Sequence, residues 1–186
     1  MIPKNFEEQL EYGKAFENII AKWMMNKGYF VTPKYLFTGE NDNEAPMMFG
    51  KNKKLVIPDI DAAKQGKRIW VECKRKKRMK CHPATGFSTR LYNQYKEVQE
   101  ITGSSVFIIF WDETNINNEY YGNWINILEQ NVYKKGFFIW NKHINKKEPH
   151  ILFKYPEAFQ VINLDNNLAI KKSREAKISI SIEDFI

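Results

Sequence analysis

Apolar residues recur at helical spacing along residues 6–27 and predict a long first helix that ends at Gly28. The positions of this apolar stripe are Phe6, Leu10, Gly13, Ile20 and Met24. Glu17 stands where the series requires another apolar residue. Because an ionised carboxylate on a buried face is costly unless a cation or hydrogen-bond donors meet it, Glu17 lies either at the edge of the core or in a polar site.

Short apolar runs further along the chain predict several strands and a second helix. In chain order, the pattern predicts a strand at residues 29–35, a polar loop at 38–53, a hairpin with strands at 55–61 and 68–74, a helix from Ser88 to about Thr102 that Gly103 closes, and a central strand at 105–111. The buried stripe of the second helix is expected to consist of Leu91, Tyr95, Val98 and Ile101.

Residues 120–186 are less regular, and we interpret them as a β-rich extension. Residues 123–133 form either a helix or a strand, and strands are predicted at 136–140, 151–153 and 178–182. A chain of 186 residues has the length of one ordinary domain. We therefore expect a single α/β domain at 1–186, with a core at about 5–112 and an extension at about 113–186.

The hairpin is predicted to bring two carboxylates together. If Gln65 and Gly66 form its two-residue turn, Asp59 lies directly opposite Glu72, with their Cβ atoms roughly 5 Å apart. Two like charges at this spacing destabilise a strand pair unless something positive lies between them, and a divalent cation is the natural candidate. The alternative is a surface hairpin with a cross-strand cluster of salt bridges.

The alternation of the second hairpin strand adds an ammonium to this pair. Trp70, Glu72 and Lys74 share one face of the strand, and Val71 and Cys73 lie on the other. Two carboxylates and an ammonium on one sheet face can bind a metal, hold a phosphate and position a water for attack.

The face assignment leaves a rival ligand. Asp61 also falls on the face of Asp59. An error of one residue in the register would weaken the assignment of Asp59 as the metal ligand.

The charge of the chain favours a polyanionic partner. The net charge is +7 and the pI is about 9.2, which indicates nucleic acid in preference to a membrane. No apolar run approaches the roughly 20 residues of a spanning helix, and the N-terminus lacks the apolar region of a signal peptide. We therefore expect a protein of the cytoplasm. The basic stretch at 74–83 is a solvated loop, a targeting signal or a set of contacts to phosphates.

Other chemistry has weaker support in the sequence. Motifs of the forms GxxxxGK[ST], GxGxxG and HExxH are absent. A zinc site of His82, Cys73 and Cys81 is disfavoured, because Cys73 points away from Glu72 and no second ligand pair follows. The aromatic residues of the second half are expected mainly in the core, although one or two could stack on single-stranded nucleic acid: Trp111, Tyr120, Tyr121, Trp124, Phe137, Phe138 and Trp140.

The motifs and their order resemble the PD-(D/E)xK nuclease superfamily. Pro58-Asp59 matches the PD motif, and Glu72-Cys73-Lys74 matches (D/E)xK on the next strand. The resemblance covers about residues 6–111 and implies a restriction-endonuclease-like core of the order αβββαβ. The segment from Gly13 to Glu17 resembles the first-helix motif of Holliday-junction-resolvase-like enzymes, in which the glutamate joins the metal site.

The resemblance also implies roles for individual residues. Mg²⁺, with Mn²⁺ as an alternative, would be bound by Asp59, Glu72, the carbonyl of Cys73 and Glu17. Lys74 would orient the attacking water or stabilise the developing charge. Arg90, Gln94 and Tyr95 resemble positions where several branches place a glutamine or a basic residue near the scissile phosphate, and Gln94 would hold the water or the lysine. The residues expected to contact nucleic acid are Arg75, Lys76, Lys77, Arg78, Lys80 and Arg90.

These features predict a metal-dependent deoxyribonuclease, and specifically a structure-selective endonuclease such as a Holliday junction resolvase. Symmetric cleavage of a junction requires two sites and hence a homodimer. Two alternatives stay open: a restriction-type enzyme with sequence specificity, and a DNA-binding module of the same fold without activity. The resemblance is compatible with a phage or mobile-element origin.

Overall fold

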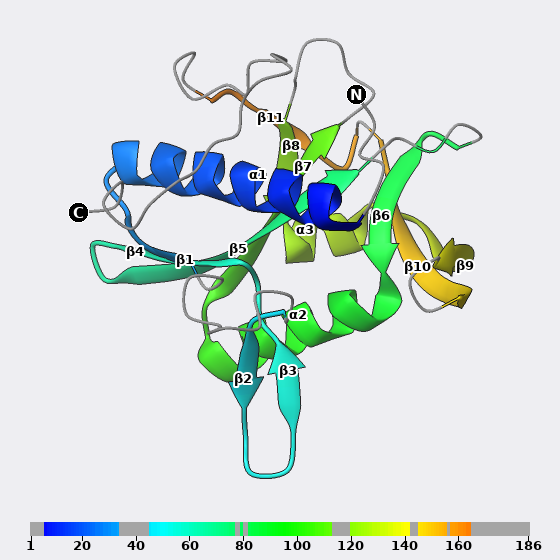
Figure 1. The fold of residues 1–186 in the computed structure, drawn as a ribbon, viewed down its shortest axis with the longest axis horizontal. Helices are drawn as coiled ribbons and strands as arrows, with labels where there is room; N and C mark the ends of the chain where they lie inside the picture. Colours follow the sequence, from blue (N-terminus) through cyan, green and yellow to red (C-terminus); the bar gives the residue numbers. More distant parts are fainter. Residues whose placement is uncertain are drawn as a thin grey trace.

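The computed structural model describes residues 6–33, 45–76, 79, 82–112, 120–141, 145–155 and 157–164; only the backbone is described at 6–10 and at Pro33. Figure 1 shows a sheet crossed by helices, with a second, smaller sheet beside it. Within the described residues, no helix is both long and apolar enough to cross a membrane.

The principal sheet has six strands and mixed pairing. In spatial order it consists of β1 (Phe30–Pro33), β4 (Ile60–Lys64), β5 (Lys67–Lys76), β7 (Ser105–Asp112), β8 (Tyr120–Trp124) and β11 (Gln160–Ile162). β5 and β7 pair in parallel, and the other neighbours are antiparallel. The expected class, α/β with a mixed central sheet, is confirmed.

Two helices cover opposite faces of this sheet, α1 (Phe6–Asn26) and α2 (Thr89–Thr102) (Figure 1). Alternate residues of β5 enter the two resulting cores. Val71 and Cys73 pack with Phe16 and Ile20 of α1, whereas Trp70 packs in the cluster that contains the buried residues of α2. Both faces of the central strands are therefore buried, as the apolar run at 105–111 predicts.

Two smaller sheets are inserted around this core. One pairs β2 (Met47–Phe49) with β3 (Lys54–Val56); the other has the order β6 (Ala84–Ser88), β10 (Lys146–Lys154), β9 (Val132–Asn141), and a short α3 (Ile125–Gln130) precedes β9. β6 and β10 approach closely at Gly86, where a Cβ would lie 1.9 Å from the carbonyl oxygen of Ile151. Only glycine fits this contact.

Several boundaries differ from the predictions. The polar loop predicted at 38–53 is wrong at residues 47–49, which form β2. The first hairpin strand begins at Ile60 and not at residue 55, because Leu55 and Val56 pair with β2. Pro58 separates the two strands, since proline cannot donate a backbone hydrogen bond and restricts the residue before it.

The predicted bounds of α2 are confirmed, but the burial of two of its side chains differs from the prediction. Ile101 is exposed, and Tyr92 is buried beside Tyr95 and Val98. Ser88 makes no capping hydrogen bond to the helix backbone; its hydroxyl donates to Glu148 Oε1 at 2.7 Å.

The extension is β-rich where it is described, with α3 inside the segment left open as helix or strand. The strand predicted at 178–182 lies outside the described residues. Three of the aromatic residues expected in the core are instead exposed: Trp124 at the end of β8, and Phe138 and Trp140 on β9.

Candidate active site

The turn of the β4–β5 hairpin sets its register. Gln65 and Gly66 both have positive φ angles, 50° and 75°, as a two-residue type I′ turn requires. Ile60 pairs with Val71 and Asp61 with Trp70. The predicted register is therefore confirmed, and its continuation by one residue sets Asp59 opposite Glu72.

Asp59 lies just before β4 and is tied to the neighbouring strand. Its Oδ2 accepts a hydrogen bond from the backbone N–H of Cys73 at 2.8 Å. Burial raises the pKa of the Asp59 carboxyl well above its ordinary value, and the charges of Glu72 and Glu17 raise it further. Lys74 and the Cys73 N–H act in the opposite direction.

Glu72 is the most deeply buried of the site's carboxylates, with 1% of its surface exposed. Its Oε1 contacts the ammonium of Lys74, and its Oε2 has no hydrogen-bond partner among the described residues. Burial by itself would lower the pKa of Lys74, but the charges of Glu72 and Asp59 outweigh it and raise that pKa. Lys74 therefore stays protonated, while one buried oxygen of Glu72 lacks a donor or cation.

Glu17 reaches this cluster from α1. Burial, and then the charge of Glu72, raise its pKa to about 8, against the opposing charges of Lys74 and Lys14. The carboxylate that interrupts the apolar stripe of α1 thus shares an electrostatic environment with β5. This accounts for its position in the stripe.

Tyr95 of α2 completes the cluster from the other side of the sheet. The Lys74 Nζ lies 5.9 Å from the centroid of its ring, and its hydroxyl lies in the field of the Glu72 carboxylate. Burial, followed by the charge of Glu72, raises the pKa of its hydroxyl well above the ordinary value. The sequence pattern assigned Tyr95 to the buried stripe of α2. A buried tyrosine usually finds a partner for its hydroxyl, and this was the available signal.

The cluster contains more acidic groups than basic ones. Asp59, Glu72 and Glu17 are three carboxylates, and Lys74 is the ammonium that acts on all of them. Oxygen ligands of this kind suit a hard divalent cation, and the unpartnered Oε2 of Glu72 supplies a free acceptor. Within the described part of the chain, however, no three His, Cys, Asp or Glu side chains form a preassembled metal-binding group.

Asp61, the rival ligand, is engaged elsewhere. Arg68 Nε donates to Asp61 Oδ1 at 2.8 Å, and Arg68 Nη2 donates to Oδ2 at 2.6 Å. The guanidinium also lies 4.8 Å from the centroid of the Trp70 ring. Both carboxylate oxygens of Asp61 thus face Arg68.

The two polar residues predicted on α2 contact each other. Arg90 Nη1 donates to Gln94 Oε1 at 3.3 Å. The charge of Arg90 also acts on Tyr95, so this pair borders the cluster. The hydrogen bond described for Gln94 goes to Arg90 rather than to Lys74 or to a carboxylate.

The basic stretch is only partly described. Arg75 lies over the rings of Tyr12 and Trp111, at 4.5 and 5.2 Å from their centroids, on the α1 side of the sheet. Lys76 lies on the opposite side. Lys77, Arg78 and Lys80 fall outside the described residues.

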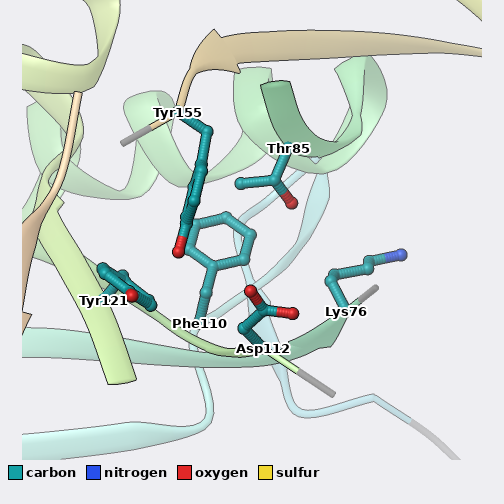
Figure 2. Close-up of a pocket in the computed structure, with 6 residues that line it drawn as sticks. All are labelled: Lys76, Thr85, Phe110, Asp112, Tyr121 and Tyr155. Atoms are coloured by element: carbon teal, nitrogen blue, oxygen red, sulfur yellow. The ribbon is translucent and has the colours of Figure 1, made fainter. Parts of the chain in front are cut away.

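A small pocket lies two residues beyond Lys74 on the same face of β5. It has room for about one water molecule and is lined by Lys76, Thr85, Phe110, Asp112, Tyr121 and Tyr155. Figure 2 shows the carboxylate of Asp112 and the hydroxyl of Thr85 directed into the same space, whereas the ammonium end of Lys76 points outward. The polar character of the sheet thus continues past Lys74 to the ends of β5 and β7.

Comparison with known proteins yields structural likenesses only. No family model matches the chain, and no curated protein matches it. The fold resembles that of Hjc, a Holliday junction resolvase from Archaeoglobus fulgidus, at 12% identity and a TM-score of 0.45 over 84% of this chain and 91% of the other. It also resembles D212, a nuclease from a fusselovirus, at 11% identity and a TM-score of 0.39 over 86% and 89%.

The disfavoured zinc site finds no support in the geometry. Cys73 is a buried free cysteine whose side chain packs on the α1 side of the sheet, away from Lys74. Burial and the neighbouring charge of Asp59 raise the pKa of its thiol, which opposes the thiolate form that zinc requires. His82 contacts the rings of Tyr133 and Phe137. Cys81 lies outside the described residues.

Proposed function

We propose that this protein is a metal-dependent nuclease that hydrolyses phosphodiester bonds in DNA. The observation that carries the proposal is the cluster of Asp59, Glu72 and Glu17 around Lys74, with one buried oxygen of Glu72 unpartnered. Burial and mutual repulsion raise the pKa of Asp59 and of Glu17. Carboxylates with a pKa raised in this way are typical of functional sites. A purely structural salt-bridge cluster would match its charges more closely.

Asp59, Glu72 and Glu17 would hold Mg²⁺ or Mn²⁺ together with the backbone carbonyl of Cys73. When bound, the metal would polarise a phosphoryl oxygen and lower the pKa of a bound water. The residues present fit such an ion, because all three side chains supply hard oxygen ligands and the carboxyl groups outnumber the one ammonium.

Lys74 supplies the positive charge that the protein itself brings to the reaction. Its raised pKa keeps the ammonium protonated near neutral pH. Three N–H donors beside a phosphate can orient a water and stabilise the negative charge that develops on the phosphoryl oxygens. Tyr95 presents its ring to the ammonium, and its hydroxyl lies in the field of the Glu72 carboxylate.

The substrate that we favour is branched DNA, cut by a structure-selective endonuclease such as a junction resolvase. The net charge of +7 supports a nucleic-acid partner. The position of Glu17 in α1, close enough to act on Glu72 and Lys74, supports the resolvase-like reading of the first-helix motif. A restriction-type enzyme is the alternative within the same chemistry, and a homodimer would supply the two sites of symmetric cleavage.

A DNA-binding module without activity is the second candidate. One observation favours it: the Lys74 ammonium contacts Glu72 Oε1, and the described residues contain no preassembled metal-binding group. Such a module would bind DNA with its carboxylates neutralised by Lys74 and by protons.

Cleavage assays separate these functions. The purified protein is incubated with a four-way junction, linear duplex, single-stranded DNA and RNA in Mg²⁺, Mn²⁺ or EDTA. Cleavage that requires a metal and is lost in Glu72→Gln supports the nuclease, and preference for the junction supports the resolvase. Binding of DNA without cleavage of any substrate supports the inactive module and refutes the nuclease.

A further inference from the structure

Strand β9 exposes two large aromatic side chains next to each other. Phe138 is 62% exposed and Trp140 is 54% exposed. They are two residues apart in a strand, so both point to the same side of the sheet. Soluble proteins seldom leave a phenylalanine and a tryptophan side by side in water without a partner for them.

The neighbouring strand extends this surface. In the register of the hairpin, Phe138 pairs with Pro149 and Trp140 with Lys147, and both β10 residues are exposed. We call these four residues the aromatic face. β9 is an edge strand of its sheet and lies at the right-hand margin of Figure 1.

The hairpin that carries the aromatic face is basic. The two strands expose five lysines: Lys134, Lys135, Lys146, Lys147 and Lys154. Lys147 belongs to the aromatic face itself, whereas Lys134 Nζ lies 5.3 Å from the centroid of the neighbouring Phe137 ring. The acidic residue between them, Glu148, uses both carboxylate oxygens internally, one accepting from Ser88 and the other from Asn141 Nδ2. A ligand at this face therefore meets flat aromatic rings beside the Lys147 ammonium, on a hairpin with further exposed lysines.

We propose that the aromatic face binds unpaired nucleotides of a single-stranded DNA segment by stacking bases on Phe138 and Trp140. Every base offers a π-face, so exposed rings bind single strands with little sequence preference, and adjacent lysines bind the backbone phosphates. Paired bases cannot stack on such rings without leaving the duplex. A purely apolar protein partner would leave the lysines without a counterpart.

The aromatic face is joined to the candidate active site through β10. Glu148 accepts a hydrogen bond from Ser88, the residue that precedes α2, and the charge of Arg90 acts on the same carboxylate. α2 carries Arg90 and Tyr95, which border the carboxylate cluster. A strand held on β9 would therefore lie in a fixed relation to the cluster. On the proposed nuclease function, this names the substrate class: DNA with an unpaired segment near the cleaved bond.

Binding in EDTA tests the aromatic face without reference to cleavage. Anisotropy of a labelled single-stranded oligonucleotide is measured for the wild type, Phe138→Ala and Trp140→Ala, with Phe49→Ala as the matched control, since Phe49 is 76% exposed on β2. We expect each aromatic variant to bind about 5-fold to 100-fold more weakly. The Phe49 variant should bind like the wild type.

Two further variants sharpen the assignment. Trp140→Phe should retain binding but lose the tryptophan quenching that stacked bases cause. Lys147→Gln should reduce the slope of log binding constant against log salt by about 0.7, the value for one phosphate contact on a single strand. An RNA oligonucleotide of the same sequence tests whether the face distinguishes the two sugars.

Several results would overturn the proposal. Unchanged single-strand affinity in both aromatic variants would do so, as would an equal loss on blunt duplex DNA. A change in sedimentation of Phe138→Ala without a change in DNA binding would identify the face as a contact between copies of the chain. If no substrate is cleaved but the aromatic variants still bind single strands more weakly than the wild type, the nuclease function is refuted and the binding role of the aromatic face is supported.

Discussion

The backbone N–H of Cys73 donates a 2.8 Å hydrogen bond to Asp59 Oδ2, across 14 positions of the sequence. The regular pairing of β4 with β5 ends one residue earlier, at Ile60 and Val71. A carboxylate that lies outside the strand is thus held by a donor whose position the sheet determines. Asp59 can keep its place beside Glu72 even when its charge is removed, which makes its role testable by a conservative change.

Asp59→Asn should abolish metal-dependent cleavage while the protein stays folded. Asparagine keeps an oxygen that can accept from Cys73 but carries no charge for a cation. We expect the cleavage rate to fall roughly 100-fold or more, as when several kcal/mol of charge stabilisation are lost. Single-turnover cleavage of the preferred substrate measures the loss, and calorimetric titration with Mg²⁺ should show weakened binding.

Asp61→Asn is the matched control, since it lies two residues away on the same hairpin. Its carboxylate pairs with Arg68, whose side chain is 49% exposed. Pairs of this kind contribute about 0–1 kcal/mol, so both stability and cleavage should change little. If the Asp61 variant loses cleavage and the Asp59 variant retains it, the assignment of the ligand is wrong.

Lys74→Met should separate metal binding from catalysis. Methionine fills similar space but leaves three carboxylates without the ammonium that acts on them. In EDTA we expect a lower Tm, because like charges then face each other uncompensated. Mg²⁺ should raise the Tm more than in the wild type, since no ammonium competes for Glu72, yet cleavage should remain undetectable.

Lys96→Met provides the comparison for this variant. Lys96 pairs with Glu129 at 2.7 Å, and both side chains are partly exposed, at 28% and 39%. Its loss should have little effect on Tm in either condition and none on cleavage. Equal shifts in the two variants would show that Lys74 is an ordinary surface cation.

Tyr95→Phe should reduce turnover more than substrate binding. The change keeps the ring beside Lys74 and removes the hydroxyl on which the charge of Glu72 acts. We expect unfolding to become easier by about 1–3 kcal/mol, the usual effect of removing a partner of a buried polar group. kcat should fall while KM stays within about twofold, because Tyr95 acts through Glu72 rather than on the substrate.

Tyr92→Phe on the same helix controls for loss of a buried hydroxyl. Burial and the charge of Glu129 raise the pKa of Tyr92, and neither cause involves the carboxylate cluster. The variant should lose no turnover. A similar fall in kcat for both tyrosines would assign the effect to packing of α2.

The hairpin was the most predictable part of the site. A two-residue turn at Gln65 and Gly66 leaves one register for the strands, and period-two alternation then sets the faces of Glu72 and Lys74. Glu17 could be singled out from the sequence for a related reason. A carboxylate at an apolar position of a helix requires a polar group or a cation near it in the folded protein. Local sequence patterns were sufficient for features whose geometry depends on residues close together in the chain.

The remaining features depend on pairings between distant segments. β6 pairs with β10 across more than sixty positions, and no local pattern specifies this contact. Apolar periodicity also does not show which side of a strand stays uncovered, so Phe138 and Trp140 were expected in the core. The position of Tyr95 beside Lys74 depends likewise on how α2 packs against β5.

The stability of the metal-free protein should fall as the pH rises towards about 8. The ordinary pKa of Glu17 is 4.5, and the folded protein raises it to about 8, with Asp59 raised as well. Between these values the folded state holds protons that the unfolded state has released. The stability that they contribute is complete below the ordinary pKa and is lost as the pH rises through the folded one.

Thermal unfolding in EDTA from pH about 5 to about 8.5 measures this effect. Glu17→Gln cannot ionise and should show a smaller fall in Tm over the range. His150 acts in the opposite direction, because burial lowers its pKa below 6.5 and its contribution is lost as the pH falls. Both proteins contain His150, so the difference between their Tm values at each pH removes its contribution. Mg²⁺ should stabilise the wild type most at high pH, where the carboxylates are ionised, and a pH-independent difference between the two proteins would contradict the raised pKa of Glu17.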